Sequence, residues 1–102
     1  MAHWIVWEFR PRPGMERAFE IAYGPNGEWA TLFSKSEAYL GTLLIRDLFE
    51  PSRYLTLDRW VSRDAFETFR QAHSQEYEAL DRRFEALTSH EAALGSYETV
   101  EG

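Results

Sequence analysis

The sequence predicts an α+β fold in which strands and helices follow one another in the order β-α-β-β-α-β and the strands form one antiparallel sheet. Two observations carry this prediction. Between residues 54 and 87 the spacing of apolar residues changes from every second to every third or fourth residue, as it does where a strand leads into a helix. The remaining segments alternate in the same way and are separated by Pro- and Gly-rich turns. At 102 residues, the chain is expected to form a single domain over residues 1–102.

The first strand is predicted at residues 4–9, which are rich in aromatic and branched side chains. Alternation places Ile5, Trp7 and Phe9 on one of its faces. A helix then opens at residues 13–14 and repeats apolar positions at helical spacing before a turn at residues 24–27. A second, short helix is predicted from Glu28 to Ser34, with Trp29, Leu32 and Phe33 on one side.

Two further strands are predicted at residues 39–48 and 54–60, joined by a tight turn at residues 50–52, so that they pair antiparallel. Strict alternation in the first of them separates two sets of side chains: Leu40, Thr42, Leu44 and Arg46 on one face, and Tyr39, Gly41, Leu43, Ile45 and Asp47 on the other. Both sets are largely apolar, so both faces are expected to be covered.

From Ser62 onward an apolar stripe at helical spacing predicts one continuous helix or two helices in close register; its members are Phe66, Phe69, His73, Tyr77, Leu80, Phe84 and Leu87. Thr88 and Glu91 then match a capping box for a short turn that Gly95 would end, before a closing strand at residues 96–100. The order is that of a ferredoxin-like sheet with helices on one face. The bare face is predicted to pack against a second copy in a homodimer.

Composition restricts the possible partners. The net charge of −6 argues against nucleic acid and against anionic membrane surfaces. The absence of cysteine excludes disulfides and thiolate nucleophiles, and the sequence suggests neither a signal peptide nor a membrane span, so a cytoplasmic protein is expected. Aromatic residues make up 16% of the chain, and these rings can fill a core, an interface or a pocket for a flat ligand.

The chain resembles the antibiotic biosynthesis monooxygenase domains of the dimeric α+β barrel superfamily. The segments that carry the resemblance are Gly27-Glu28-Trp29, Tyr39-Leu40-Gly41-Thr42, the strand from Tyr54 to Trp60, Ala65-Phe66, Phe69, His73, Tyr77 and Leu94-Gly95. The resemblance implies a homodimer. The family contains oxygenases that act on aromatic polyketides without a cofactor, enzymes that degrade haem, and many members of unknown function.

Cofactor-free oxygenation has a plain chemical requirement. Ground-state dioxygen is a triplet, so the substrate must itself supply an electron, as an ionised phenol or hydroquinone does. The protein must supply a base, a donor for the oxyanion and a dry aromatic slot. We predict His73 as the base, with Tyr77 as the donor one helical turn away. Each of the two fits an ordinary core residue as well.

Four residues are predicted to contact the substrate: Trp29, Phe33 and Trp60 as aromatic walls, and Arg46 as an anion-binding group. The alternative for each is a structural role, and for Asp58 the simple interpretation is an ion pair with Arg46 or Arg59. His73 and Glu76 are spaced to share a metal ion, but no third ligand follows, so no metal is predicted.

Two rival functions remain open from the sequence: a dimer that binds a small aromatic molecule without catalysis, and a haem-degrading enzyme. The haem branch uses an Asn on the first strand, a Trp on the helix after the third strand and an axial His on that helical segment. Only His73 survives from that set, so no cofactor is predicted.

Overall fold

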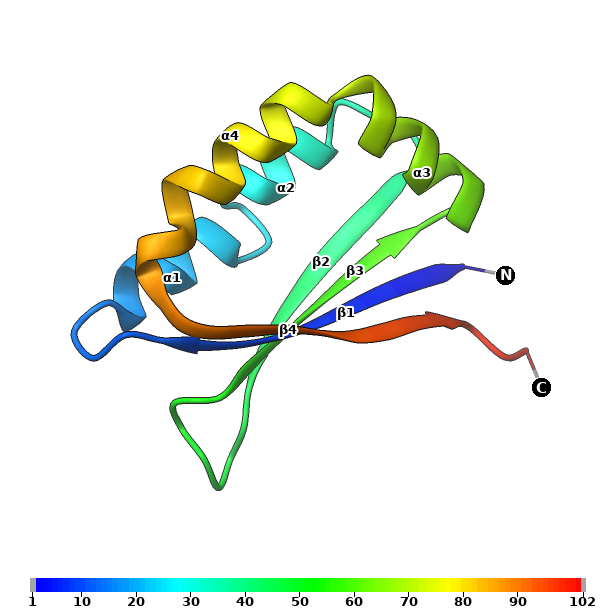
Figure 1. Cartoon of the computed structure of the whole chain (residues 1–102). Helices are drawn as coiled ribbons and strands as arrows, with labels where there is room; N and C mark the ends of the chain where they lie inside the picture. The colour runs from blue at the N-terminus through cyan, green and yellow to red at the C-terminus, as the bar shows by residue number, and fades with distance from the viewer. Residues whose placement is uncertain (1, 102) are drawn as a thin grey trace.

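The computed structural model describes residues 2–101 and shows four strands in one sheet, with the helices on one of its faces (Figure 1). The elements in chain order are β1 (His3–Pro11), α1 (Glu16–Tyr23), α2 (Glu28–Phe33), β2 (Tyr39–Arg46), β3 (Tyr54–Trp60), α3 (Arg63–Ala72), α4 (Ser74–Phe84), the 3₁₀ turn η1 (Glu85–Leu87) and β4 (Thr88–Glu98). The strand order is β2-β3-β1-β4, and every neighbouring pair is antiparallel. The predicted α+β fold is confirmed.

The segment after β3 forms two helices. The Ser62 hydroxyl accepts a hydrogen bond from the Ala65 amide at 3.1 Å, which caps α3. The backbone of His73 leaves the helical region (φ −117°, ψ 30°), so α3 ends there and α4 begins at the next residue. The apolar stripe is therefore divided between two helices that meet at His73, and the side chains of α3 and α4 do not share one continuous face.

A bulge in β2 changes which side chains face the helices. Tyr39 pairs with Trp60 and Gly41 with Arg59, so Leu40 is an extra residue opposite β3. Gly41 has φ +133°, a conformation that favours glycine. Tyr39 therefore joins Thr42 on the helix-covered face, and the predicted strict alternation of this strand is wrong at residues 39 and 40.

The ends of two predicted strands also differ. The second strand stops at Arg46, because the Asp47 carboxylate accepts hydrogen bonds from the amides of Phe49 and Glu50 and turns the chain. The predicted turn at residues 88–94 is wrong, since Thr88 begins β4, which pairs with β1 from Thr88 to Glu98 with irregularities at Ser89 and Leu94. A capping-box pattern is a local signal, and here the ladder with β1 satisfies the same backbone groups.

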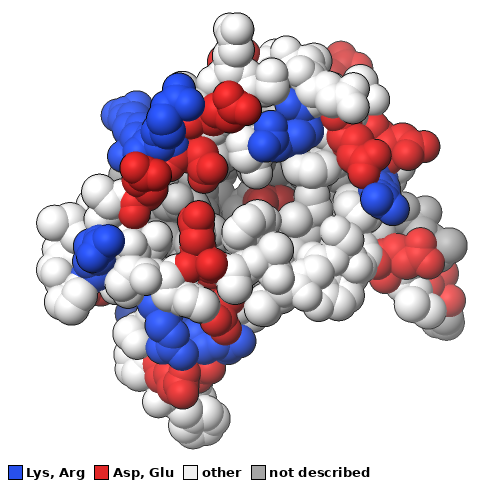
Figure 2. Space-filling model, in the orientation of Figure 1, with Lys and Arg blue, Asp and Glu red and all other residues white. Residues whose placement is uncertain are grey.

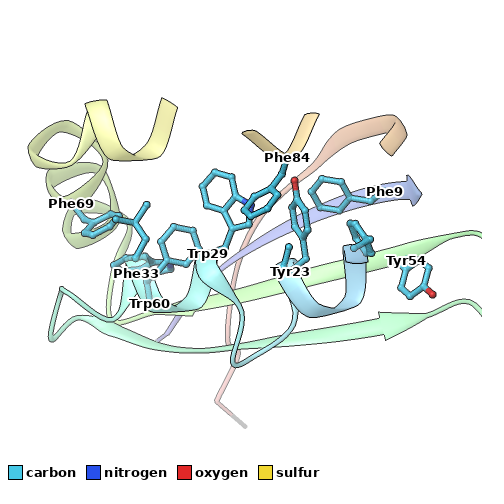
Figure 3. Packing of buried hydrophobic residues seen from close by; sticks show 11 residues of the cluster. Phe9, Tyr23, Trp29, Phe33, Tyr54, Trp60, Phe69 and Phe84 are labelled. Carbon is cyan, nitrogen blue, oxygen red and sulfur yellow. The ribbon is translucent and has the colours of Figure 1, made fainter. Parts of the chain in front are cut away.

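Aromatic side chains dominate the core between the sheet and the helices (Figure 3). Trp60 and Phe19 are completely buried. Trp60 lies under the helix that follows it, with its ring centroid 5.2 Å from those of Phe66 and Phe69. At the other end of the layer, Phe19 stacks on Tyr23 at 4.5 Å. No helix within residues 2–101 is both long enough and apolar enough to span a membrane.

Candidate functional site

The aromatic core between the sheet and the helices is not completely filled. A cavity of about 610 Å³ lies between the helix-facing side of the sheet and the helices. Figure 2 shows the molecule hollowed on this side, between the helices and the sheet below them. All four strands contribute residues to the floor, β2 through Thr42, and the helices α1 to α4 supply the opposite wall. The cavity is mainly aromatic: its lining includes Trp7, Phe9, Tyr23, Trp29, Phe33, Phe66 and Tyr77.

A carboxylate is built into this aromatic lining. Asp58 lies on β3 between Thr56 and Trp60, on the face that the helices cover. Its Oδ1 accepts a hydrogen bond from the Thr42 hydroxyl at 2.6 Å. Burial raises the pKa of the Asp58 carboxyl to about 6, and the hydrogen bond from Thr42 acts in the opposite direction. At neutral pH the group is therefore an ionised base with more than ordinary proton affinity.

Titratable side chains from α3, α4, β1 and β4 line the same cavity: His3, Arg63, Glu67, Arg70, Asp81 and Glu91. The Arg70 guanidinium lies 3.8 Å from the centroid of the Tyr77 ring, close enough for a cation–π contact. Burial is the main reason that the pKa of Tyr77 lies above its usual value. Tyr77 is thus a neutral phenol throughout the physiological range, able to donate a hydrogen bond.

Three of the predicted site residues line the cavity together. Trp29 and Tyr77 make an edge-to-face contact with ring centroids 4.9 Å apart, and Phe33 lies beside both at 5.9 and 6.4 Å. The short helix α2 supplies Trp29 and Phe33, while α4 supplies Tyr77. These residues form one continuous aromatic wall.

The other two predicted contact residues are placed elsewhere. Trp60 is buried beneath α3 and does not line the cavity. Arg46 stands at the far end of β2, where its side chain is 59% exposed and lies 3.9 Å from the Glu20 carboxylate. Neither residue is in contact with the cavity.

His73, the predicted base, also lies outside this lining. Its ring stacks on Phe69 at 4.6 Å, and its Nδ1 is 2.8 Å from Oε1 of Glu76, which also binds Lys35. It borders a smaller surface pocket beside α3. Because the helix breaks at His73, the structure does not bring His73 and Tyr77 to the same cavity, although they are four residues apart.

The sequence analysis gave Asp58 only a structural interpretation, and the predicted ion pair is wrong. Arg59 faces the opposite side of the sheet, where its guanidinium lies over the Trp4 ring, and Arg46 approaches Glu20. Thr42 is the only side chain within residues 2–101 that hydrogen-bonds to Asp58. A usable signal was present: Asp58 is the one acidic residue at an inward-facing position of its strand, and no base stands opposite it.

The donor set decides which cofactors fit. Within residues 2–101 no group of three or more His, Asp or Glu side chains is arranged to hold a metal ion. The haem-degrading branch would use His73 as the axial ligand, but His73 lies outside the cavity, and the imidazole that lines it belongs to His3 on β1. The residues present do not match that arrangement.

Comparisons with known proteins identify a family and a shared fold. The sequence profile of the family described as antibiotic biosynthesis monooxygenase matches residues 3–83. No curated protein matches the chain in sequence. Among solved structures, a Bordetella bronchiseptica protein that carries the same family description is 19% identical with a TM-score of 0.74, and 98% of each chain is covered.

Two other solved structures have similar folds. SnoaB, a cofactor-independent oxygenase from Streptomyces nogalater, is 17% identical with a TM-score of 0.66, covering 99% of this chain and 95% of that one. A protein from Mycobacterium tuberculosis is 15% identical with a TM-score of 0.66, covering 100% and 98%. At these identities the likeness concerns the fold.

Proposed function

The chain belongs to the antibiotic biosynthesis monooxygenase family, and on that premise we propose that it catalyses the cofactor-independent monooxygenation of a small phenolic or quinone-like compound. The observation that carries the proposal is the aromatic cavity with the Asp58 carboxylate in its wall. The cofactor-independent activity of SnoaB, which has the same fold, supports it.

Asp58 is the proposed base. Its carboxylate accepts the proton of a substrate hydroxyl, and the phenolate that forms is electron-rich enough to give one electron to dioxygen. The resulting radical pair combines to a hydroperoxide at a ring carbon that carries hydrogen. Loss of that hydrogen as a proton breaks the O–O bond, so one oxygen atom stays on the ring as a quinone carbonyl and the other leaves as water, and the C–H bond of the substrate supplies the electron pair. A phenol ordinarily has a pKa near 10. The raised pKa of Asp58 brings the proton affinity of the base closer to that of the substrate phenolate, which favours proton transfer.

Tyr77 and Arg70 are the proposed oxyanion partners. Both line the cavity, and the phenol of Tyr77 stays protonated because burial raises its pKa. A hydrogen-bond donor and a guanidinium stabilise the developing phenolate more strongly in a cavity that excludes water than in solution. Trp29 and Phe33 would hold the flat ring system, and a volume of about 610 Å³ lies within the usual range for small-molecule sites.

Oxygen uptake with a panel of benzo- and naphthohydroquinones tests the proposal. We expect Asp58→Asn to lower kcat by about 10²- to 10⁴-fold, the usual contribution of a general base. His73→Gln is the matched control, because His73 lies outside the cavity; it should retain wild-type turnover.

The opposite result would support the prediction made from the sequence. If His73→Gln lost turnover while Asp58→Asn remained active, His73 would be the base. A wild-type protein that consumes no more oxygen than a buffer blank with any compound would overturn the oxygenase proposal. Ligand binding without uptake would then favour a non-catalytic binding protein.

We further propose that two copies associate through the sheet face that the helices leave bare. Leu43 and Ile45 of β2 are 55% and 47% exposed there, and Leu55 and Leu57 of β3 continue the same surface. In a dimer with a two-fold axis the same face of each subunit forms the interface, so this apolar face would pack against its own copy. The homodimer implied by the family resemblance would bury it.

A further inference from the structure

Three side chains on the helix-covered face of the sheet form one hydrogen-bonded series. The Tyr39 hydroxyl lies 2.5 Å from Oγ1 of Thr42, and Oγ1 of Thr42 lies 2.6 Å from Oδ1 of Asp58. Thr42 and Asp58 line the cavity, whereas Tyr39 lies behind them against Phe33 and Trp60. The series therefore connects the aromatic core to the cavity wall.

The direction of these hydrogen bonds follows from counting protons. An ionised carboxylate can only accept, so Thr42 must donate its one hydroxyl proton to Asp58. The bond between Tyr39 and Thr42 must then be donated by Tyr39. Oδ2 of Asp58 has no partner among residues 2–101, so it is the oxygen available to a ligand.

We propose that Tyr39 and Thr42 are positioning residues for Asp58: they hold Oδ1 with a donated hydrogen bond, fix the rotamer of the carboxylate, and leave Oδ2 directed at the substrate hydroxyl. This inference rests on the function proposed above. It assigns a role in the site to Tyr39, which does not itself line the cavity.

The bulge in β2 makes this arrangement possible. In a regular strand Tyr39 and Thr42 would lie on opposite faces of the sheet. The extra residue at Leu40, with Gly41 at φ +133°, brings both to the same face. The bulge thus places a second donor behind Thr42, and bulges are enriched beside active sites for this kind of re-aiming.

The charged and titratable surroundings of Asp58 determine how a titration is interpreted. Tyr39 of β2 lies behind the carboxylate, and the groups that line the same cavity are His3 from β1, Glu91 from β4, Tyr77 and Asp81 from α4, and the α3 residues Arg63, Glu67 and Arg70. Burial is the main cause of the raised pKa of Asp58, and the Thr42 bond opposes it. Removal of that bond alone should therefore move the pKa further upward.

Carboxyl carbon NMR of Asp58 as a function of pH tests the inference without requiring turnover. We expect Thr42→Val, which keeps the shape and removes the hydroxyl, to raise the Asp58 pKa from about 6 to about 7. Tyr39→Phe should shift it in the same direction by less. Thr42→Ser keeps the donor and is the matched control, with the wild-type pKa expected.

An unchanged Asp58 pKa in a folded Thr42→Val protein would overturn the inference, as would an equal shift in Thr42→Ser. In oxygen-uptake assays the acidic limb of the kcat/KM profile should move upward with the NMR value in Thr42→Val, by less in Tyr39→Phe, and not in Thr42→Ser. If the wild-type protein has no turnover, the proposed function fails while the NMR titration still decides the positioning role.

Discussion

At the scale of single residues, the ionised carboxylate of Asp58 opposes folding. Its pKa is about 6 in the folded chain, against an ordinary value of 3.8, because the aromatic cavity wall desolvates the charge. Above about pH 6 the group is ionised in both the folded and the unfolded chain, and the folded state carries the full penalty. As the pH falls from 6 towards 4, the folded state takes up the proton first, and the penalty disappears.

Asp58→Asn should therefore stabilise the protein at neutral pH although it removes the base. We expect the free energy of unfolding to rise by about 2 kcal/mol above pH 7, because the amide still accepts the Thr42 bond and carries no charge. Thermal unfolding of wild type and variant between pH 4 and pH 8 measures this. The difference should shrink towards zero near pH 4; a difference independent of pH would contradict the pKa of Asp58.

The candidate site was only partly predictable because sequence patterns describe faces and not cavities. Helical spacing correctly placed Trp29, Phe33 and Tyr77 inward, and all three line the cavity. His73 shares that spacing, but the break between α3 and α4 rotates it away, and no residue type in the sequence marks that break. Asp58 is found only when the inward positions of neighbouring strands are compared.

At the scale of elements, the bulge in β2 links backbone conformation to the site. A Cβ added at Gly41 would meet no atom within 4 Å, so the cost of a substitution there comes from its φ of +133° alone. An L-residue avoids that conformation, and the strand can relax by losing the bulge. Loss of the bulge would turn Tyr39 away from Thr42.

We expect Gly41→Ala to lower the free energy of unfolding by roughly 1–3 kcal/mol and to raise the Asp58 pKa. Gly14→Ala is the matched control: Gly14 also has a positive φ, of 87°, with nothing within 4 Å of an added Cβ, but it lies in the loop before α1. It should lose stability while the Asp58 pKa stays at its wild-type value. Urea unfolding and carboxyl NMR measure the two effects; an equal pKa change in both variants would contradict the role of the bulge.

The sequence predicted elements best where local and long-range preferences agree. β3 begins and ends where the alternation from Tyr54 to Trp60 placed it, and α2 ends one residue earlier than predicted. β4 was mispredicted because residues 88–94 carry a local capping pattern, while the free edge of β1 offers a ladder that no local pattern reveals.

At the scale of the whole molecule, the sheet has one covered face and one bare face (Figure 1). The bare face carries exposed apolar residues of β2 and half-buried ones of β3. Of its charged residues, Glu8 is paired with Arg53 at 2.6 Å and with His90 at 2.9 Å, and Arg59 lies over the Trp4 ring. Paired charges of this kind allow a surface to be buried against a second copy at lower cost than single charges.

Leu43→Glu should convert the proposed dimer to a monomer, because it places two like charges in the buried interface. Light scattering at micromolar concentration should give the 12.0 kDa of one chain for the variant and twice that mass for the wild type. Ile21→Glu is the matched control, since Ile21 is 60% exposed on α1, in the helix layer. It should remain dimeric; a monomeric wild type would overturn the proposed assembly.

The aromatic cavity wall also gives the protein a built-in optical reporter. The chain has four tryptophans, and two of them, Trp7 and Trp29, line the cavity. Trp60 is buried in the core, and Trp4 contacts Arg59 on the other face of the sheet. A quinone entering the cavity would quench the emission of the first two at contact distance and leave Trp4 and Trp60 as an internal reference. Occupancy of the site can thus be followed in the unlabelled protein, before any substrate is known.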